Sequence, residues 1–303
     1  MKYALSIDIG GTNTRVSLID NAMHVVAYES FTTDNTSPSN TLDRIKIITE
    51  AFDYEVEGIG LSCPGPLDLK KGIILTPPNL PGWHGFEIVK EMESRFNIAT
   101  YLENDANLAG LAEACIGSGQ TYESVQYMTI STGVGGGYIH KKEIFQGSHG
   151  FAQEIANVIL VPNGYSVGDL LPGSLESLVS GTAIVSRAKA KGYTMMHAGE
   201  VSDLANLGNK DCLDIMNDAK EYLANAIAML YAVLDPEVVV LGGSVALKID
   251  GFVEEVEALV EKKVYPVVAK HINIRKAQLG DDNGIMGGAI LVFNTKGIKY
   301  TRF

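Results

Sequence analysis

Short hydrophobic runs alternate with glycine-rich turns and amphipathic stretches in the first third of the chain. Residues 3–9 and 15–19 are two such runs on either side of a turn with two adjacent glycines, and they predict a β-hairpin. Hydrophobic positions then recur every three or four residues over 41–52, which predicts an amphipathic helix, and 58–62 is again strand-like. The predicted order is therefore β-β-α-β, which is typical of an α/β fold.

The rest of the chain continues this alternation of strands and helices. Asp235-Pro236 ends one long helix, because proline cannot continue the helical hydrogen-bond ladder. The polar segment 195–209 predicts only a loop or a short helix cap. The last predicted helix would return to pack on the N-terminal region, which makes the domain boundary discontinuous. We expect further strands at 99–102, 126–130, 238–241 and 272–277, and helices at 108–114, 219–234, 254–260 and 284–293.

Length and composition predict two domains with buried cores. The chain has 303 residues, of which 46% are hydrophobic. We place a smaller α/β domain at 1–117 plus about 290–303, and a larger one at 118–289. The net charge of -12 gives no electrostatic support for a nucleic-acid groove, so we expect no nucleic-acid partner.

The cysteines and the N-terminus predict a cytoplasmic protein. Cys63, Cys115 and Cys212 are scattered and have no paired spacing, which indicates free thiols in a reducing compartment. The first residues contain too few hydrophobic positions for a signal peptide, and no later run approaches membrane-spanning length. We therefore expect no membrane partner.

The stretch 103–107 places an acid, Asp105, between Asn104 and Asn107, just after a predicted strand. A carboxylate there is a candidate base, and the amides are candidates for holding hydroxyl groups, which both donate and accept hydrogen bonds. The alternative is that this stretch only caps the following helix, as Asn and Asp commonly do. The string by itself leaves both interpretations open.

Glycine-rich turns recur at three places along the chain. The turn after the first strand combines Asp8 with adjacent glycines and with Thr12 and Asn13, which could cradle a phosphate and hold a magnesium ion through water. A plain tight hairpin is the alternative, and the turn is not a Walker loop because no Gly-Lys-Ser/Thr follows. A second strand, turn and strand follows at 126–139, and Gly242-Gly243 forms a third turn suited to the nucleoside end of the same ligand.

Five motifs follow one another along the chain: Asp8-Ile9-Gly10-Gly11-Thr12, Cys63-Pro64-Gly65-Pro66-Leu67-Asp68, Pro78-Asn79-Leu80-Pro81-Gly82-Trp83, Glu103-Asn104-Asp105-Ala106-Asn107 and Thr132-Gly133-Val134-Gly135-Gly136-Gly137. Taken together in this order, they resemble the ROK family of bacterial sugar kinases and repressors. The resemblance covers nearly the whole chain and extends through Glu176 and Ser180-Gly181-Thr182. It implies an actin-like ATPase fold of two RNase H-like α/β domains, with ATP and sugar meeting in the cleft between them.

The resemblance also implies a role for each matching residue. Asp105 corresponds to the base that takes the proton from the 6-hydroxyl of a hexose, and the acceptor would be a glucose-type sugar or an N-acetylhexosamine. ATP and Mg²⁺ would be bound by the glycine turns and by Asp8, and the family suggests a homodimer. The sugar residues would be Gly65, Asn79, Asn104, Glu154, Asn157 and Glu176, and the ATP residues Asp8, Gly10, Gly11, Thr12, Asn13, Thr132, Gly133, Gly136, Gly242 and Gly243.

One segment departs from the family pattern. Members often carry a His that contacts sugar and binds a structural zinc together with three cysteines. Here Asn157 stands in the place of the His, and the cysteine places fall on Val167, Asp169 and Ser174. We therefore expect no zinc site, and a loop at about 162–173 held by hydrogen bonds and packing instead. Loss of this His also leaves the sugar preference open.

Other functions stay under consideration. β-Glucoside kinases of the family also depart at this His, so a glycoside or disaccharide acceptor is one alternative. A repressor would need a DNA-binding helix-turn-helix ahead of Asp8, where the sequence has no room for one. A non-catalytic sugar sensor would be expected to lose Asp105 or the Gly10-Gly11 turn. His84 and His149 lie in loops near the expected site, but show no metal-ligand spacing.

Overall fold

The computed structural model describes residues 1–301, and the contacts within it divide the chain into two compact units. Unit 1 comprises Met1–Gly117, Lys142–Ala152 and the chain from Asp281 onward, and unit 2 comprises Ser118–Lys141 and Gln153–Gly280. These units differ from the expected ranges in two places. Lys142–Ala152 belongs to unit 1, and the C-terminal segment that returns to unit 1 begins at Asp281. Residues 302–303 of the expected range 290–303 lie outside the described residues.

Unit 1 is built on a mixed sheet with strand order β3-β2-β1-β4-β7. β1 pairs antiparallel with β2, and β1, β4 and β7 are parallel to one another. A small hairpin of β5 and β6 and a short strand, β10, lie outside this sheet. The bounds are β1 Tyr3–Ile9, β2 Asn13–Asp20, β3 Val25–Thr32, β4 Ile59–Cys63, β5 Leu67–Asp68, β6 Ile73–Ile74, β7 Thr100–Asn104 and β10 Glu143–Ile144.

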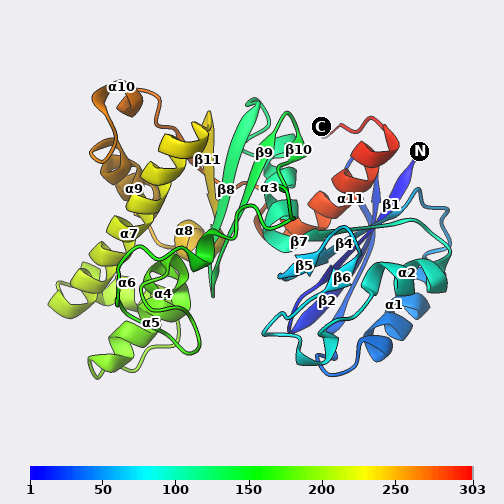
Figure 1. Ribbon diagram of the computed structural model, residues 1–303, viewed down its shortest axis with the longest axis horizontal. Coiled ribbons are helices and arrows are strands. Elements are labelled where there is room, and N and C mark those ends of the chain that lie inside the picture. Colours follow the sequence, from blue (N-terminus) through cyan, green and yellow to red (C-terminus); the bar gives the residue numbers. More distant parts are fainter. Residues whose placement is uncertain (302–303) are drawn as a thin grey trace. The chain divides into compact units, whose positions relative to one another are not determined.

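Helices cover both faces of the unit 1 sheet (Figure 1). α1 and α2 pack on one face, where Leu42, Ile45 and Ile88 join a hydrophobic core with Ile7 and Ile9 of β1. α11 covers the other face, with α3 beside it. The helix bounds are α1 Pro38–Phe52, α2 Ile88–Phe96, α3 Asp105–Ile116 and α11 Asn283–Lys296, with 3₁₀ turns at Pro81–Trp83 and Gly280–Asp282.

Glycines allow α11 to approach the sheet and α3 closely. A Cβ atom added at Gly60 of β4 would lie 2.0 Å from the carbonyl oxygen of Gly288 in α11. A Cβ added at Gly287 would lie 2.0 Å from the carbonyl oxygen of Leu108 in α3. Real Cβ atoms do not approach backbone atoms so closely, so the layer spacing in unit 1 depends on these positions having no side chain.

Unit 2 places its strands in the order β9-β8-β11-β12 and packs most of its helices on one side of them (Figure 1). Its core joins Met128 and Leu241 of the strands to Leu223 and Ile227 of the long helix α7. The bounds are β8 Ser124–Ile130, β9 Val134–His140, β11 Val238–Gly242, β12 Ile274–Lys276, α4 Leu175–Val179, α5 Gly181–Ala190, α6 Ala198–Asn206, α7 Lys210–Leu234, α8 Gly243–Lys248, α9 Phe252–Glu261, α10 Pro266–Ala269 and a 3₁₀ turn at Ile155–Asn157.

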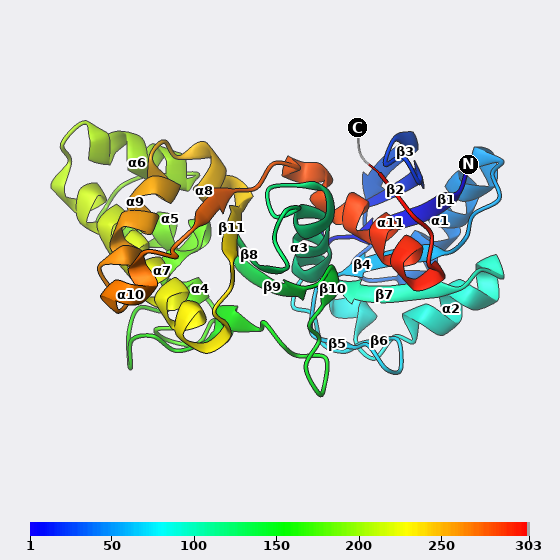
Figure 2. The ribbon, with the colours of Figure 1, turned by 90° about the horizontal axis from the view of Figure 1, so that it is seen from above.

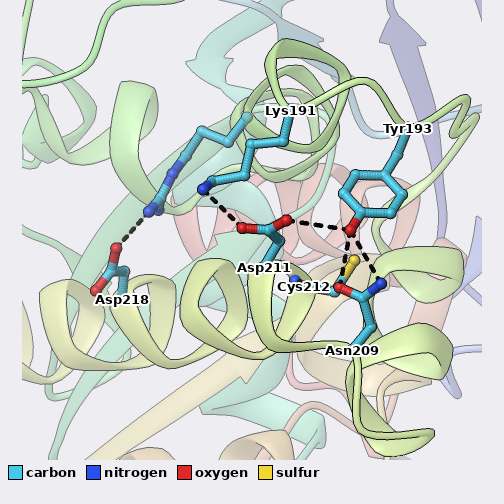
Figure 3. Close-up of polar contacts among 7 residues, drawn as sticks. Lys191, Tyr193, Asn209, Asp211, Cys212 and Asp218 are labelled. Atoms are coloured by element: carbon cyan, nitrogen blue, oxygen red, sulfur yellow. Dashed lines mark hydrogen bonds and ion pairs between the residues drawn. The ribbon is translucent and has the colours of Figure 1, made fainter.

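A polar network holds the start of α7 (Figure 3). The side chain of Asn209 caps the helix by accepting from the backbone N of Cys212 at 3.1 Å. The Tyr193 hydroxyl lies 3.1 Å from Asp211 Oδ2 and 3.0 Å from Asn209 Nδ2, and Lys191 Nζ donates to Asp211 Oδ1 at 2.8 Å. This cap begins the helix at Lys210, nine residues before the predicted start at 219, where the pattern is more polar.

The predicted elements are present, and the structure adds others that the pattern did not indicate. β3 was not predicted because most of its side chains are exposed and its sequence mixes polar and apolar residues. α6 occupies most of the segment 195–209, with His197 at its N-cap accepting from the backbone N of Glu200 at 3.3 Å. Within residues 1–301 no helix is both long enough and apolar enough to cross a membrane.

The close contact at Gly60 makes a test of the unit 1 packing. Because its Cβ would clash with the α11 backbone, we expect Gly60→Ala to lower the free energy of unfolding by about 3 kcal/mol. Gly208→Ala is the control, since Gly208 has φ +89 but open space around it, and should cost only about 1 kcal/mol. Urea unfolding curves measure both, and equal small losses would contradict the close approach.

Candidate active site

The carboxyl ends of the parallel strands β1, β4 and β7 meet at one edge of the unit 1 sheet. In the pairing register Asp8 lies beside Ser62, and Cys63 lies beside Asn104. Burial raises the pKa of the Cys63 thiol well above its ordinary value, and the carboxylates of Asp8 and Asp105 raise it further. Both carboxylates therefore lie close to this strand end, which is where α/β sheets bind ligands.

Asp105 is exposed and is the first residue of α3. Its Oδ1 accepts from the backbone N of Ala106 at 2.8 Å. The positive end of the helix dipole stabilises a negative charge at this position. The capping interpretation is confirmed for Asn104, whose Oδ1 accepts from the backbone N of Ala106 at 3.0 Å and of Asn107 at 3.4 Å. Asn104 thus caps the helix through its Oδ1, and Asp105 is an exposed residue of the first helical turn.

The Asp8 carboxyl group is removed from solvent, and two neighbours, Ser62 and Arg15, offset part of the cost of burying its charge. Burial raises the pKa of its carboxyl group, while a hydrogen bond from Ser62 Oγ at 2.7 Å and the charge of Arg15 lower it. Gly284, in the first turn of α11, also approaches this carboxylate, since an added Cβ would lie 3.8 Å from Asp8 Oδ2. A carboxylate oxygen fits a hard cation such as Mg²⁺, which usually keeps several water ligands and can be held by one or two carboxylates.

The first glycine turn lies directly against the loop that carries Asn79. The turn is closed by a hydrogen bond from Gly10 N to Asn13 O at 2.9 Å. A Cβ atom at Gly11 would lie 2.6 Å from Cβ of Asn79, so the two backbones approach closely. Thr12 and Asn79 are exposed, as is Asn13. The structure therefore brings the expected phosphate turn and an expected sugar residue together within unit 1.

Trp83 connects the Asn79 loop to the turn at Asp34, which follows β3. The indole of Trp83 is buried, and its Nε1 donates to the carbonyl oxygen of Asp34 at 2.9 Å. The neighbouring Thr33 donates from its backbone N to Thr12 O at 2.8 Å. Phosphate turn, Asp34 turn and Asn79 loop thus form one connected structure. Gly65 is half-buried in the loop after β4.

The Asp34 carboxylate holds its own turn together. Its two oxygens accept from Thr36 N at 3.0 Å, Thr36 Oγ1 at 2.7 Å, Ser37 N at 3.0 Å and Asn40 Nδ2 at 2.9 Å. These bonds, led by that from Asn40, lower the pKa of Asp34 to about 2. The backbone carbonyl of Asp34 accepts the hydrogen bond from Trp83 Nε1. By fixing the turn that positions this carbonyl, the Asp34 carboxylate indirectly supports the Asn79 loop.

The second glycine turn, in unit 2, joins β8 to β9 and holds Glu176. Ser131 N donates to Gly133 O at 2.9 Å, and Thr132 O accepts from Thr182 Oγ1 at 2.8 Å. Glu176 Oε2 accepts from Val134 N at 2.8 Å. A Cβ added at Gly133 would lie 2.7 Å from the same oxygen. Glu176 is therefore fixed against the turn.

The carboxylates of Glu154 and Glu176 lie close enough to repel each other electrostatically. Partial desolvation raises the pKa of Glu154, and the Glu176 carboxylate raises it further. Asn157 follows in the 3₁₀ turn Ile155–Asn157 and is exposed. Unit 2 thus gathers Glu154 and Glu176, two acceptors suited to sugar hydroxyls.

The remaining expected ATP residues of unit 2 separate into two settings. Gly242 is the last residue of β11 and Gly243 is the first residue of α8. Gly243 has φ +84, and an added Cβ would lie 2.4 Å from Ile130 O, at the end of β8. Ser244 Oγ lies 3.2 Å from Ser131 Oγ, so the second and third glycine turns touch. Gly136 instead lies within β9, where an added Cβ would meet the Ile155 side chain at 2.6 Å.

Known proteins resemble this chain over nearly its whole length. The profile of the ROK family matches residues 4–295. The chain belongs to the ROK family. Glucokinase from Halalkalibacterium halodurans is 28% identical over 315 residues, which span 96% of this chain and 95% of the relative. N-acetylmannosamine kinase from Yersinia pestis is 28% identical over 291 residues, which span 96% and 98%.

A solved structure confirms the fold class. The ROK family glucokinase from Streptomyces griseus, in complex with glucose and AMPPNP, has a TM-score of 0.77 and 25% identity to this chain. The comparison covers 95% of this chain and 98% of the glucokinase. The expected actin-like ATPase fold with α/β sheets is therefore confirmed for this ROK family member.

In this ROK family chain, hydrogen bonds hold the loop at about 162–173, where the family pattern led us to expect the loss of a zinc site. Leu160 N donates to Gly173 O at 2.8 Å, and Gly173 N donates to Tyr165 O at 2.8 Å. Ser174, at one cysteine place, caps α4 by accepting from Ser177 N at 3.3 Å. Within residues 1–301 no group of three or more His, Cys, Asp or Glu side chains could hold a metal ion. Absence of zinc stays a prediction.

Sequence reasoning missed Glu103 and Gln146. Glu103 is completely buried, and its Oε2 accepts from Gln146 Nε2 at 2.6 Å although the two residues are 43 positions apart. The only sequence signal was that Glu103 stands beside the Asn104-Asp105 pair. His84 Nε2 lies 3.1 Å from Pro77 O in the Asn79 loop, and His149 is exposed.

The low pKa of Asp34 predicts an acid-dependent contribution to stability. Its folded pKa of about 2 lies below the ordinary 3.8, so the contribution is complete above pH 3.8 and is lost as pH falls through about 2. We expect Asp34→Asn to unfold at lower urea concentration than the wild type at pH 7, with the two curves converging near pH 2. Fluorescence of Trp83, the sole tryptophan, reports the transition. A difference independent of pH would contradict this role.

Proposed function

We propose that this ROK family chain is an ATP-dependent sugar kinase that transfers the γ-phosphoryl group of ATP to the 6-hydroxyl of a hexose, either of the glucose type or an N-acetylhexosamine. The observation that carries the proposal is the exposed Asp105 at the N-terminus of α3, on the strand edge that also holds Asp8. The relatives named glucokinase and N-acetylmannosamine kinase support the two sugar classes.

Asp105 would act as the general base. Its carboxylate accepts the proton of the sugar 6-hydroxyl as the oxygen attacks the γ-phosphorus, and the bond from the γ-phosphorus to the β,γ-bridging oxygen breaks. Phosphoryl transfer depends mainly on positioning and charge neutralisation, so an exposed carboxylate fixed at a helix start suffices as the base. The Ala106 N bond to Asp105 Oδ1 orients the carboxylate without covering it.

The sugar would be held by the residues around Asp105 and by the acids of unit 2. In unit 1, Asn104 Nδ2 and the Asn79 amide can donate to hydroxyl oxygens, while Gly65 leaves room for the ring. In unit 2, Glu154 and Glu176 can accept from hydroxyl groups, and Asn157 can do either. Asn157 stands where many family members carry a His that contacts the sugar, so the preference among sugars would depend on Asn157.

The nucleotide would be bound by the glycine turns. Gly10, Gly11, Thr12 and Asn13 in unit 1 offer backbone and side-chain donors to phosphate oxygens. In unit 2, Thr132, Gly133 and Gly136 would serve the phosphates, and Gly242 and Gly243 the nucleoside. The glucose and AMPPNP complex of the Streptomyces griseus relative supports ATP as the donor.

Asp8 would hold Mg²⁺ through water. When bound, Mg²⁺ neutralises charge on the transferring phosphates. Ser62 fixes the Asp8 carboxylate by a 2.7 Å hydrogen bond, so it stays directed while its other oxygen remains available to a water ligand.

The proposal also covers the oligomeric state and the cellular compartment of the protein. The family resemblance supports a homodimer, and three cysteines without paired spacing support the cytoplasm. The net charge of -12 disfavours a nucleic-acid partner. The experiment below also distinguishes two alternatives: a kinase whose acceptor is a β-glucoside or a disaccharide, and a non-catalytic sugar sensor.

The decisive experiment measures ADP release with Mg-ATP against glucose, N-acetylmannosamine, N-acetylglucosamine, allose, fructose and a β-glucoside. We expect turnover with one sugar class and a loss of about 10²–10⁴-fold in kcat for Asp105→Asn, which keeps its shape and cannot accept the proton as a carboxylate does. Sugar affinity of the variant should stay within about threefold. Sugar binding without turnover in the wild type would instead favour the sensor.

Metal analysis tests the zinc prediction separately. Because Asn157, Val167, Asp169 and Ser174 replace all four ligands, purified protein should carry less than about 0.1 zinc per chain, and EDTA should leave its unfolding curve unchanged. Zinc in a one-to-one ratio with the chain would refute this expectation.

A further inference from the structure

Glu103 is a buried carboxylate that the proposed reaction does not use. It lies in β7 and is 0% exposed. Its Oε1 accepts from the backbone N of Asn104 at 2.9 Å and from Asn107 Nδ2 at 2.9 Å, and its Oε2 accepts from Gln146 Nε2 at 2.6 Å. Three donors therefore hold one carboxylate away from water.

Two of these bonds fix the chain on either side of Asp105. Asn104 precedes Asp105 and caps α3, and Asn107 follows it by two residues. Asn107 is 4% exposed, and its Oδ1 has no hydrogen-bond partner among the described residues. The side chain of Asn107 is therefore oriented by its bond to Glu103, which ties the first turn of α3 to the end of β7.

The third donor comes from a distant part of the sequence. Gln146 belongs to Lys142–Ala152, which packs with unit 1. In the same segment Lys142 Nζ donates to Ala114 O, near the other end of α3, at 2.6 Å. The segment is thus tied near both ends of the helix that begins with Asp105, and its Gln146 side chain bonds to Glu103.

Simple filling of space does not account for a carboxylate here. Burial raises the pKa of Glu103, while the bonds from Asn107, Asn104 and Gln146 lower it. An apolar side chain would fill the same volume without the cost of desolvating a charge. The carboxylate differs from an apolar side chain because it accepts three hydrogen bonds from fixed directions, and these bonds hold the start of α3.

We propose that Glu103 is a positioning residue for Asp105, and that with Gln146 it fixes the first turn of α3 so that the base meets the sugar hydroxyl at reacting distance. This inference rests on the proposed kinase function. Glu103 acts through its hydrogen bonds and their geometry, and the interaction with Gln146 is a specific donor-acceptor pair. A displacement of the base by about 1 Å is enough to lower the rate of transfer about 100-fold.

A swap of the pair tests this proposal. Gln146→Glu places two carboxylates in contact, and we expect kcat to fall about 10- to 100-fold while the KM for sugar changes less than about threefold. The double variant Glu103→Gln with Gln146→Glu restores one amide and one carboxylate with their places exchanged, and should recover kcat to within about threefold of the wild type. Glu143→Gln, an exposed change in the same segment, is the matched control and should leave kcat unchanged.

Urea unfolding of each variant separates positioning from loss of fold. A double variant as slow as Gln146→Glu, although folded, would overturn the proposal, as would Gln146→Glu with wild-type kcat. If the swap variants fail to fold, Glu103→Gln alone remains decisive, because the Gln146 amide can turn to present its oxygen and kcat should stay within about threefold. A folded Glu103→Gln with a 100-fold loss would overturn the inference.

The pH profile supplies a readout that general stability does not move. If Glu103 acts by its hydrogen bonds, the acid limb of kcat/KM in Glu103→Gln should coincide with that of the wild type to within about 0.2 pH units. A shift of about one unit would show that the Glu103 charge sets the basicity of Asp105, and would overturn positioning as its role. Wild-type protein without turnover would refute the kinase proposal itself, whereas failure of the swap in an active enzyme refutes only this inference.

Discussion

The parallel pairing of β1, β4 and β7 is the constraint on which the candidate site of unit 1 depends. Parallel strands end at the same edge of a sheet, so Asp8, Cys63 and Asn104 come together although they are far apart in sequence. α3 begins at that edge and presents Asp105, while α11 brings its first turn towards Asp8. The close seat of α11 on β4, made possible by Gly60 and Gly288, is what allows this arrangement.

The carboxylates at this edge are placed in opposite environments. Asp105 is exposed at a helix start, where the dipole favours its charged form and solvent or a substrate can reach it. Glu103, two residues earlier, is fully buried and bonded to three donors. The proposed base is therefore an exposed acid, whereas Glu103 is buried and holds the local backbone through its hydrogen bonds. This division suits a reaction in which positioning supplies most of the rate enhancement.

The glycine turns are supported by neighbouring loops rather than by their own hydrogen bonds alone. In unit 1, Gly11 packs on Asn79, and Trp83 and Asp34 return that loop to the phosphate turn. In unit 2, Glu176 seals the Gly133 turn, and Gly243 packs under Ile130. In both units, glycine is required because another backbone or a carboxylate occupies the space of a side chain. Within unit 1, the expected phosphate turn and the expected sugar residue Asn79 are consequently parts of connected loops.

The sequence by itself determined the alternation of strands and helices, the three glycine turns and the family, because these depend on local periodicity and on motifs that stand together in the chain. It also indicated Asp105, since an acid between amides after a strand is visible locally. Only the tertiary structure decided that Lys142–Ala152 packs with unit 1, that Glu176 closes the Gly133 turn, and that Gln146 binds Glu103. The last two contacts join residues 42 or 43 positions apart, and nothing in the sequence near either residue shows that the two meet. The strand β3 escaped prediction for a related reason: its pairing with β2 supplies its stability, while its exposed side chains follow no hydrophobic period.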